Sequence, residues 1–348
     1  MKTTLKLAIW SLAALLAVGF AACNKDDIEL SNPRITLTTA KNVGKKISLY
    51  IDADDADKAG VWIDLNNNGI KENNEAVTGF NNKEEVQIKY LLGAQTITIY
   101  GKVTKLECGD TEVVDGNQLT ALDVSKNTAL IWLECNENQL KALDVSKNSA
   151  LAYLSCDDNQ LIALNVGKNS ALTELHCGNN QLTALDVSKN KALHILNCQN
   201  NQLTELNVSK NTGLWTLHCG NNQLKALDLS KNTKLNYLHC YNNQLKALDL
   251  SKNTKLMKLD CSGNQLTALN VIKNTKLEYL CCYNNKISDK MEALVNSLPD
   301  RTASTKGYFY VIKTGTGENN KCTQEQVTIA TSKNWNVRYS NGQPYTGS

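Results

Sequence analysis

One sequence pattern, L-x-x-L-x-C-x-x-N-x-[LI], repeats eight times between Leu130 and Asn285 with a period of 21 residues. Its cysteine marks every copy: Cys135, Cys156, Cys177, Cys198, Cys219, Cys240, Cys261 and Cys282. A fixed period in the twenties is typical of solenoids, in which each repeat buries its apolar side chains against its neighbours. The period therefore determines the fold of almost half the chain, and it directs the search for function to one repeated surface.

The residues within one repeat indicate how it folds. Leu133 and Cys135 alternate with residues such as Trp132, so that one set points inward and the other outward. In stacked parallel strands, each inward side chain lies about 4.8 Å from its copy in the next turn. Asn138 lies where the chain leaves the strand, and a buried amide there can bond unpaired backbone groups. We therefore predict a mainly β fold, a short-repeat leucine-rich repeat solenoid with a parallel sheet.

The full repeat, L-x-x-L-x-C-x-x-N-x-L-x-x-L-D-V-S-x-N-x-x, resembles the cysteine-ladder repeats of the internalins, a family of bacterial surface adhesins. The resemblance covers Leu119 to Asn285 and does not include the segments on either side. It implies a recognition protein of the cell surface, but it does not transfer a ligand.

The segment before the array has a different pattern. Short runs of alternating apolar and polar residues, such as 34–38, 47–51 and 97–100, are separated by polar and glycine-rich turns. Residues 33–103 are therefore predicted to form a small antiparallel β-domain of the sandwich type. The array, predicted over 104–286, begins with an atypical repeat, as expected of an end repeat that covers the open hydrophobic stack.

After Asn285 the period fails, and residues 287–348 are predicted to form an α/β cap. Residues 288–298 have helical spacing of apolar residues, with Ser288 as the expected N-cap and Pro299 as the stop. The pattern further predicts a strand over 308–312, a helix over 323–332 and a strand over 335–339.

Residues 1–22 combine a basic start, an apolar stretch and small residues before Cys23, which is typical of a secretion signal peptide. A membrane-spanning helix is the alternative, but it requires roughly 20 apolar residues and a stop-transfer flank. The polar residues after Cys23 make a poor flank of that kind. Phe20-Ala21-Ala22-Cys23 resembles a bacterial lipobox, which implies lipidation of Cys23 and a lipidated tether over 23–32.

Two acidic residues, Asp26 and Asp27, follow the lipobox closely. They resemble the surface-export tag of lipoproteins in the Bacteroidetes. The resemblance implies an outer membrane lipoprotein at the cell surface, which contacts the membrane through its lipid anchor only.

The chain contains 12 cysteines, a number that in an exported protein first suggests a disulfide framework. Inward cysteines of stacked repeats have parallel Cα–Cβ bonds, which do not meet the geometry of a disulfide. A ladder of buried free thiols fits better, with partial disulfides or a metal site as the alternatives. Cys281 occupies an outward position beside Cys282, so we predict that its thiol is the most reactive.

Residues 64–75 fit the pattern D-x-[DN]-x-[DN]-G-x₅-E of an EF-hand loop. Asp64, Asn66, Asn68 and Glu75 would supply the oxygen ligands that suit calcium. However, a strand rather than a helix is predicted before the loop, and asparagines replace two of the usual acidic ligands. A polar hairpin turn is therefore the alternative to a calcium site.

The outward positions of the repeat strands differ from turn to turn, whereas the inward positions do not. They predict an acidic and aromatic cluster near the N-terminal end and an aromatic cluster near the C-terminal end. The alternative is that these are scattered surface side chains without a function. The histidines form a flat column that suits solvated side chains better than a metal site. The predicted binding face comprises Trp132, Glu134, Tyr153, Asp157, His218, Tyr237, His239, Tyr241, Tyr279 and Tyr283.

The composition narrows the class of function. The 37 basic and 34 acidic residues nearly balance, so no nucleic acid partner is implied. We find no G-x-S-x-G, H-E-x-x-H or paired-acid motif, and no cofactor other than calcium is suggested, so an enzyme is not predicted. The sequence favours an adhesin that recognises a host or bacterial surface protein or glycoprotein. A structural or matrix surface lipoprotein without one specific ligand is the alternative.

Overall fold

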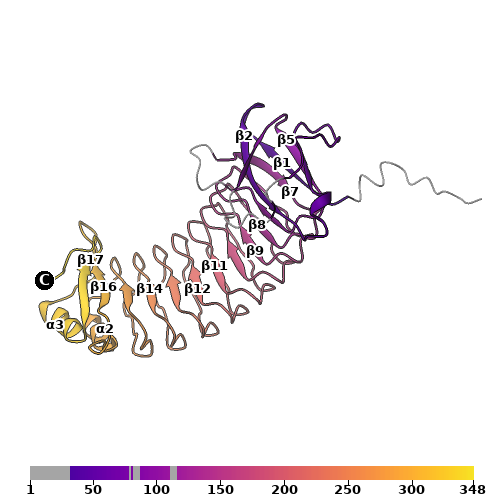
Figure 1. Ribbon diagram of the computed structural model, residues 1–348. Coiled ribbons are helices and arrows are strands. Elements are labelled where there is room, and N and C mark those ends of the chain that lie inside the picture. The colour runs from indigo at the N-terminus through magenta and orange to yellow at the C-terminus, as the bar shows by residue number, and fades with distance from the viewer. Residues whose placement is uncertain (1–31, 78–79, 81–86, 110–115) are drawn as a thin grey trace, which may run out of the picture. The chain divides into compact units, whose positions relative to one another are not determined.

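The computed structural model describes residues 32–77, 80, 87–109 and 116–348, of which residues 33–348 form one compact unit. The predicted signal peptide, Cys23 and the predicted tether up to residue 31 lie outside the described residues. Within the described part of the chain, the main element is a 13-stranded sheet in the order β17-β16-β15-β14-β13-β12-β11-β10-β9-β8-β6-β2-β4. Figure 1 shows its repeat strands one after another, one for each turn of the chain.

Eight short strands carry the repeats, and each pairs in parallel with the next. The register places each residue beside its equivalent in the next turn, as Leu175 pairs with Leu196. The predicted leucine-rich repeat solenoid with a parallel sheet is therefore confirmed. The strands are β8 (Trp132–Glu134), β9 (Tyr153–Ser155), β10 (Glu174–His176), β11 (Ile195–Asn197), β12 (Thr216–His218), β13 (Tyr237–His239), β14 (Lys258–Asp260) and β15 (Tyr279–Cys281).

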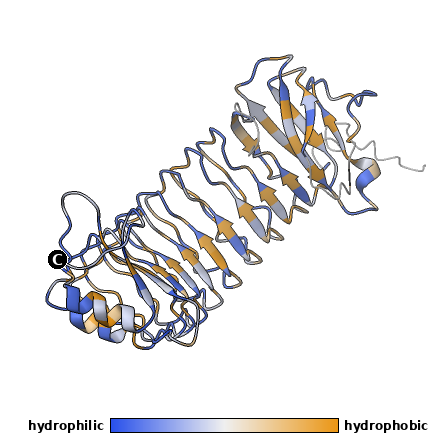
Figure 2. Ribbon diagram, turned by 60° about the vertical axis from the view of Figure 1, so that its left-hand side comes forward, coloured by the Kyte–Doolittle hydropathy of each residue, from blue (hydrophilic) through white to orange (hydrophobic). Residues whose placement is uncertain are grey.

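The inward side chains form the core that the alternation predicts. Leu217 and Cys219 are fully buried, and their equivalents in the other turns are buried as well. Figure 2 shows the resulting hydrophobic segments, which recur in successive strands. All cysteines among the described residues are buried and free, so the predicted thiol ladder is confirmed and the disulfide alternative is excluded for them.

A buried asparagine at the end of each repeat strand links neighbouring turns. The amide nitrogen of Asn201 donates to the carbonyls of Cys177 and Cys198 at 3.0 and 3.2 Å. Its side-chain oxygen accepts from the backbone N–H of Leu182 at 2.9 Å. The predicted role of the turn asparagines, which is to bond backbone groups that the turn leaves unpaired, is therefore confirmed.

A second asparagine ladder lies on the other side of each turn and was not assigned from the sequence. The amide nitrogen of Asn211 donates to the carbonyls of Val187 and Asn190 at 3.0 and 2.8 Å. Its equivalents from Asn148 to Asn274 make the same two bonds to preceding turns. Both ladders tie each turn to the one before it, so the stacking depends on bonds that run along the array.

The N-terminal strands form two sheets, both of which continue into the array. An antiparallel sheet has the order β3-β5-β1-β7, and it contains β7, which lies in the first, atypical repeat. The remaining strands, β2 and β4, extend the long sheet beyond β6. The N-terminal strands are thus continuous with the repeats, and a domain boundary at residue 103 stays a prediction. The bounds are β1 (Arg34–Thr39), β2 (Lys46–Asp52), η1 (Lys58–Gly60), β3 (Trp62–Asp64), β4 (Ile88–Leu91), β5 (Thr96–Tyr100), β6 (Lys105–Glu107) and β7 (Leu119–Asp123).

The C-terminal segment adds two strands to the long sheet and places two helices beside them (Figure 1). The expected N-cap, Ser288, is wrong: the first helix begins at Met291, with Lys290 as an N-cap that makes no side-chain bond. The second helix is capped by Thr323, which forms a capping box with Gln326. Among the described residues, no helix is both long and apolar enough to cross a membrane. The elements are α2 (Met291–Ser297), β16 (Gly307–Ile312), α3 (Gln324–Ser332) and β17 (Trp335–Tyr339).

We predict that Asn201→Ala destabilises the array, because it removes the donor to two buried carbonyls and the acceptor of the Leu182 N–H. The expected loss in the free energy of unfolding is about 3 kcal/mol, measured by urea denaturation. Asn207→Ala is the matched control, because Asn207 is exposed and accepts a single bond from Ser209. Its expected loss is at most about 1 kcal/mol, and equal losses for the two variants would contradict the role of the ladder.

Candidate binding site on the strand face

The outward side chains of β6 and β8 to β17 form one surface, which we call the strand face. Because the strands pair in register, equivalent residues of successive turns stand side by side. The cap extends this face, since Tyr308 pairs with Tyr279 and Tyr310 with Cys281. The predicted binding residues of the strands therefore lie on one face, together with cap residues that the prediction did not include.

The predicted N-terminal cluster is brought together as stacked rings. Trp132 and Tyr153 stack with their centroids 3.6 Å apart and their planes at 1°. His176 continues the row at 5.6 Å from Tyr153, and the Lys105 ammonium lies 4.9 Å from the centroid of Trp132. Ring stacking and a cation over an aromatic face hold these side chains in fixed positions.

The acidic side chains of this cluster are held by internal hydrogen bonds. Glu134 accepts from the indole N–H of Trp132 at 3.1 Å. Asp157 accepts from the backbone N–H of Gly178 and from the hydroxyl of Ser155. Burial raises the pKa of the Asp157 carboxyl, although His176 and these bonds oppose the shift. Asp157 therefore helps to fix the turn and is less available to a partner than the sequence suggested.

Two predicted residues in the middle of the face, His218 and His239, stack with their centroids 4.4 Å apart and their planes at 4°. Burial, aided by the neighbouring His239 and His176, lowers the pKa of His218 to about 4. Burial also lowers the pKa of His239, while the Asp260 carboxylate opposes this shift. The pair is therefore neutral near pH 7 and offers a flat, half-buried surface.

The predicted C-terminal aromatic cluster is arranged differently from the prediction. Tyr237 faces the ammonium of Lys258, which lies 5.6 Å from its ring centroid. Tyr241 crosses the preceding turn, and its hydroxyl donates to the side chain of Gln199, two turns away, at 3.3 Å. A Cβ on Gly220 would lie 2.5 Å from the ring of Tyr241, so the glycine makes room for it. Tyr283 is half-buried two turns further along.

Tyr279 instead forms a cluster with two cap residues that the sequence analysis missed. Its ring lies 5.3 Å from that of Tyr310 at an angle of 43°, and Tyr308 lies 6.4 Å from Tyr310. The alternating Tyr-Phe-Tyr of β16 was the signal, because its central Phe309 pairs with Leu280 and so places both tyrosines outward. A hollow of about 490 Å³ adjoins them, lined by Lys258, Glu278, Tyr279, Thr305, Lys306, Tyr308 and Tyr310.

Cys281 lies on the outward side of its strand, as predicted, but it is covered. That its thiol is the most reactive one stays a prediction. Its side chain is buried, and its thiol lies 3.4 Å from the hydroxyl of Tyr279. Burial, aided by the charge of Asp260, raises the pKa of the thiol to about 12. Since the thiolate is the nucleophile, such a thiol reacts slowly at neutral pH.

The loop over residues 64–75 is closed by bonds to its own backbone. Asp64 accepts from the N–H groups of Asn68 and Gly69 at 3.0 and 2.8 Å, and Glu75 accepts from those of Leu65 and Glu72 at 2.8 and 3.0 Å. The oxygens of Asn66 and Asn68 also accept from backbone N–H groups. These bonds account for a hairpin turn, in which Trp62 bridges Ala76.

Calcium binding by this loop stays a prediction, which a comparison of melting temperatures in calcium chloride and in EGTA would test. In the described part of the chain, no group of three or more histidine, cysteine, aspartate or glutamate side chains is placed to hold a metal ion.

The solved structures that match this chain include a cysteine-ladder protein. The functional domain of InlJ from Listeria monocytogenes, which includes a cysteine ladder, matches with 31% identity and a TM-score of 0.55. The match covers 69% of this chain, which spans 55% of the length of that structure. The chain therefore contains a cysteine-ladder leucine-rich repeat array similar to that of InlJ, as the sequence predicted.

Two further solved structures match at lower similarity. An internalin, inlF, from Listeria monocytogenes has 19% identity and a TM-score of 0.45, over 67% of this chain and 79% of that one. A leucine-rich repeat protein from Leptospira interrogans has 19% identity and a TM-score of 0.44, over 63% of this chain and 64% of that one. No family model matches the chain, and no curated protein matches its sequence.

We predict that acid destabilises the protein through His218. Its pKa is about 4 in the folded chain against 6.5 ordinarily, so the unfolded chain takes up the proton first. Stability should therefore fall as the pH is lowered from 6.5 to about 4. The melting temperature of His218→Gln should fall less over this range than that of the wild type.

The exposed His194 provides the matched control. His194→Gln should follow the wild-type profile, because the substitution leaves the stacked pair intact. The test compares the pH profiles of the three proteins with one another. The other titratable groups near the pair, which include His239, His176 and Asp260, are present in all of them. Identical profiles for all three proteins would contradict the prediction.

Proposed function

We propose that the protein is an adhesin of the bacterial cell surface, which recognises a protein or glycoprotein of a host or of another bacterium through the strand face. The observation that carries the proposal is the contrast between the two sides of each strand. The inward positions repeat leucine and cysteine in every turn, whereas the outward positions change from turn to turn. Because the core does not require this variation, we attribute it to recognition.

The chemistry of the face supports binding. Rings that are half-buried and already stacked, such as Trp132 and Tyr153, lose little side-chain entropy when a partner covers them. Tryptophan and tyrosine residues also contribute a large share of the energy in many protein interfaces. Repeat solenoids use extended surfaces of this kind for binding, and the similarity to the functional domain of InlJ agrees with such a role.

The surface location in this proposal rests on the sequence before the described residues, where Cys23 follows a predicted signal peptide. We expect Cys23 to carry the lipid, since the apolar stretch and small residues before it resemble a lipobox. Cells fed a labelled fatty acid should incorporate the label into the wild-type protein but not into Cys23→Ser. Cleavage of the protein by a protease added to intact cells would then test its exposure. Label in Cys23→Ser would contradict the anchor.

We expect substitution of Trp132 and Tyr153 by alanine to weaken partner binding by about tenfold or more, because the two stacked rings form one contact surface. The partner is first identified by probing arrays of host and bacterial surface proteins and glycoproteins with the purified protein. Affinity for that partner is then measured for the wild type and the double variant.

The control carries alanine at Lys189 and Lys210, two exposed lysines that lie outside the strands. This control should keep the wild-type affinity, and the melting temperatures of both variants should show that they are folded. Equal loss of affinity in the two variants, or no loss in the aromatic one, would contradict recognition through the strand face.

A further inference from the structure

We propose that the hollow between the last repeat and the cap binds a carboxylated sugar, a pyranose ring that bears a single carboxylate, as in a uronic acid or a sialic acid. The inference deepens the proposed function, on which it rests, because it names the ligand chemistry at the C-terminal end of the strand face. The hollow measures about 490 Å³, within the range of small-molecule sites. It combines aromatic faces, two ammonium groups and one carboxylate.

The aromatic part of the hollow is a platform of three tyrosines on neighbouring strands. Tyr279 and Tyr310 lie with their centroids 5.3 Å apart, and Tyr308 lies 6.4 Å from Tyr310 at an angle of 20°. Tyr308 has 42% of its surface exposed, so that its ring is accessible to a ligand. The negative face of an aromatic ring attracts the positively polarised C–H groups of a sugar ring. A flat ring ligand therefore suits this platform.

The charges around the platform select for one negative group. Lys258 and Lys306 both line the hollow, and both are exposed. The guanidinium of Arg338 lies 5.4 Å from the ring centroid of Tyr308. An ammonium and a carboxylate form charge-assisted hydrogen bonds, which are stronger than neutral ones. The positive side chains thus favour a ligand that carries a carboxylate.

Glu278 narrows the choice of ligand further. Its carboxylate also lines the hollow, with 34% of the side chain exposed. A carboxylate accepts hydrogen bonds from sugar hydroxyls, but it repels a second negative charge. A ligand with several hydroxyls and one carboxylate can bond groups of both signs. A strongly acidic peptide or a polysulfated chain would place additional negative charge beside Glu278.

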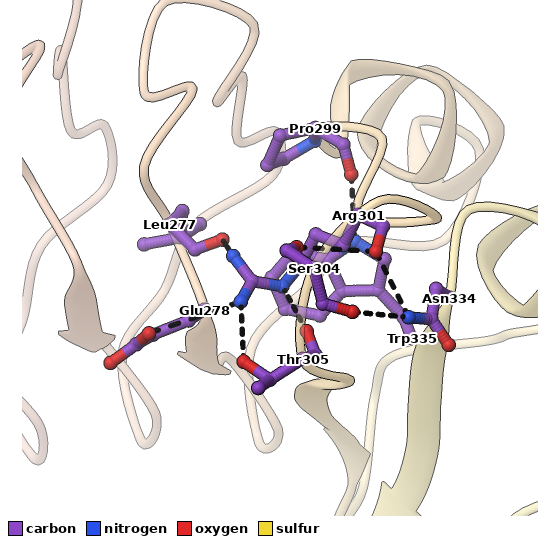
Figure 3. Close-up of polar contacts among 8 residues, drawn as sticks. All are labelled: Leu277, Glu278, Pro299, Arg301, Ser304, Thr305, Asn334 and Trp335. Atoms are coloured by element: carbon purple, nitrogen blue, oxygen red, sulfur yellow. Dashed lines mark hydrogen bonds and ion pairs between the residues drawn. The ribbon is translucent and has the colours of Figure 1, made fainter.

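The wall of the hollow is fixed by the buried Arg301 (Figure 3). Its guanidinium donates to the carbonyl of Leu277 at 3.0 Å and to the carbonyl of Thr305 at 3.0 Å. It also lies 3.9 Å from the carboxylate of Glu278. Arg301 thereby joins the last repeat to the loop that carries Thr305 and Lys306.

The loop between α2 and β16 is also held by Asn334 and by Trp335, the first residue of β17. The indole of Trp335 donates to the carbonyl of Pro299 at 2.9 Å, and the guanidinium of Arg301 lies 5.9 Å from its ring centroid. The amide of Asn334 donates to the carbonyls of Arg301 and Ser304 at 2.9 and 3.1 Å. Side chains fixed in this way before binding lose less entropy when a ligand arrives.

The test is titration of the purified protein with four probes, followed by calorimetry or ligand-observed NMR. The probes are glucuronic acid, N-acetylneuraminic acid, neutral glucose and a short acidic peptide. We expect one or both acidic sugars to bind, more weakly at high salt, and glucose to bind at least about tenfold more weakly because it lacks the charge-assisted bond. The two acidic sugars distinguish a uronic acid from a sialic acid as the source.

Variants of the exposed Tyr308 and Lys306 locate the site. Tyr308→Ala should weaken binding of the acidic sugar by about tenfold, whereas Tyr308→Phe, which keeps the ring face, should retain it. Lys306→Ala should weaken the acidic sugar and leave the affinity for glucose unchanged. Trp215→Ala is the matched control, because it removes an exposed aromatic ring that lies outside both the hollow and the strands, and it should bind the sugar as the wild type does.

The inference is overturned if neither acidic sugar binds, if glucose binds equally well, if the peptide binds in their place, or if Trp215→Ala and Tyr308→Ala lose affinity equally. Its failure is separable from that of the proposed function. Partner binding that depends on Trp132 and Tyr153, without any sugar binding, would overturn the sugar site alone. Sugar binding that depends on Tyr308, with partner binding insensitive to the strand face, would overturn the proposed function alone.

Discussion

The stacking of the turns depends on the hydrogen bonds of the buried asparagines. A strand of three residues makes few ladder bonds, so it does not define the register alone. Asn222 shows what the asparagines add. It donates to the carbonyl of Cys219 in its own turn and to that of Cys198 in the preceding turn, and it accepts from the N–H of Leu203 in that preceding turn, so it ties the two turns together. Because every turn repeats this bonding, the strands lie in register, and each outward side chain has a defined neighbour.

Because of this register, the inward positions of the repeats form the core and the outward positions form the strand face. The inward positions must repeat, because Leu196 and Leu217 meet in one column of the core and any change in volume would be felt by the turns on both sides. The outward positions are released from that constraint, since the backbone is held from within. The face can therefore present a tryptophan in one turn and a histidine in another without any change of fold.

The periodic part of the fold was predictable because residues at equivalent positions of the 21-residue repeat have equivalent neighbours in the structure. This includes the role of Asn201, which was predicted from its place at the end of the strand. The cap was less predictable. Phe309 follows Leu280 by 29 residues, not 21, so the period no longer showed that Tyr308 and Tyr310 join the same face. The burial of Cys281 was not predicted for a related reason: alternation gives the side of the sheet on which a residue lies, but not what covers it. Contacts among outward side chains depend on the identity of the neighbour in the next turn.

Those contacts also limit how the face can vary. Tyr241 lies flat because the preceding turn has Gly220, where a Cβ would collide with its ring. A similar relation occurs on the inward side of the cap, where a Cβ on Gly307 would lie 2.6 Å from the indole of the buried Trp335. A large ring on one turn thus requires its neighbour to be either a small residue or a ring on which it can stack, as Trp132 and Tyr153 do. The outward columns are therefore coupled in pairs, so a change of specificity requires compensating substitutions in adjacent turns.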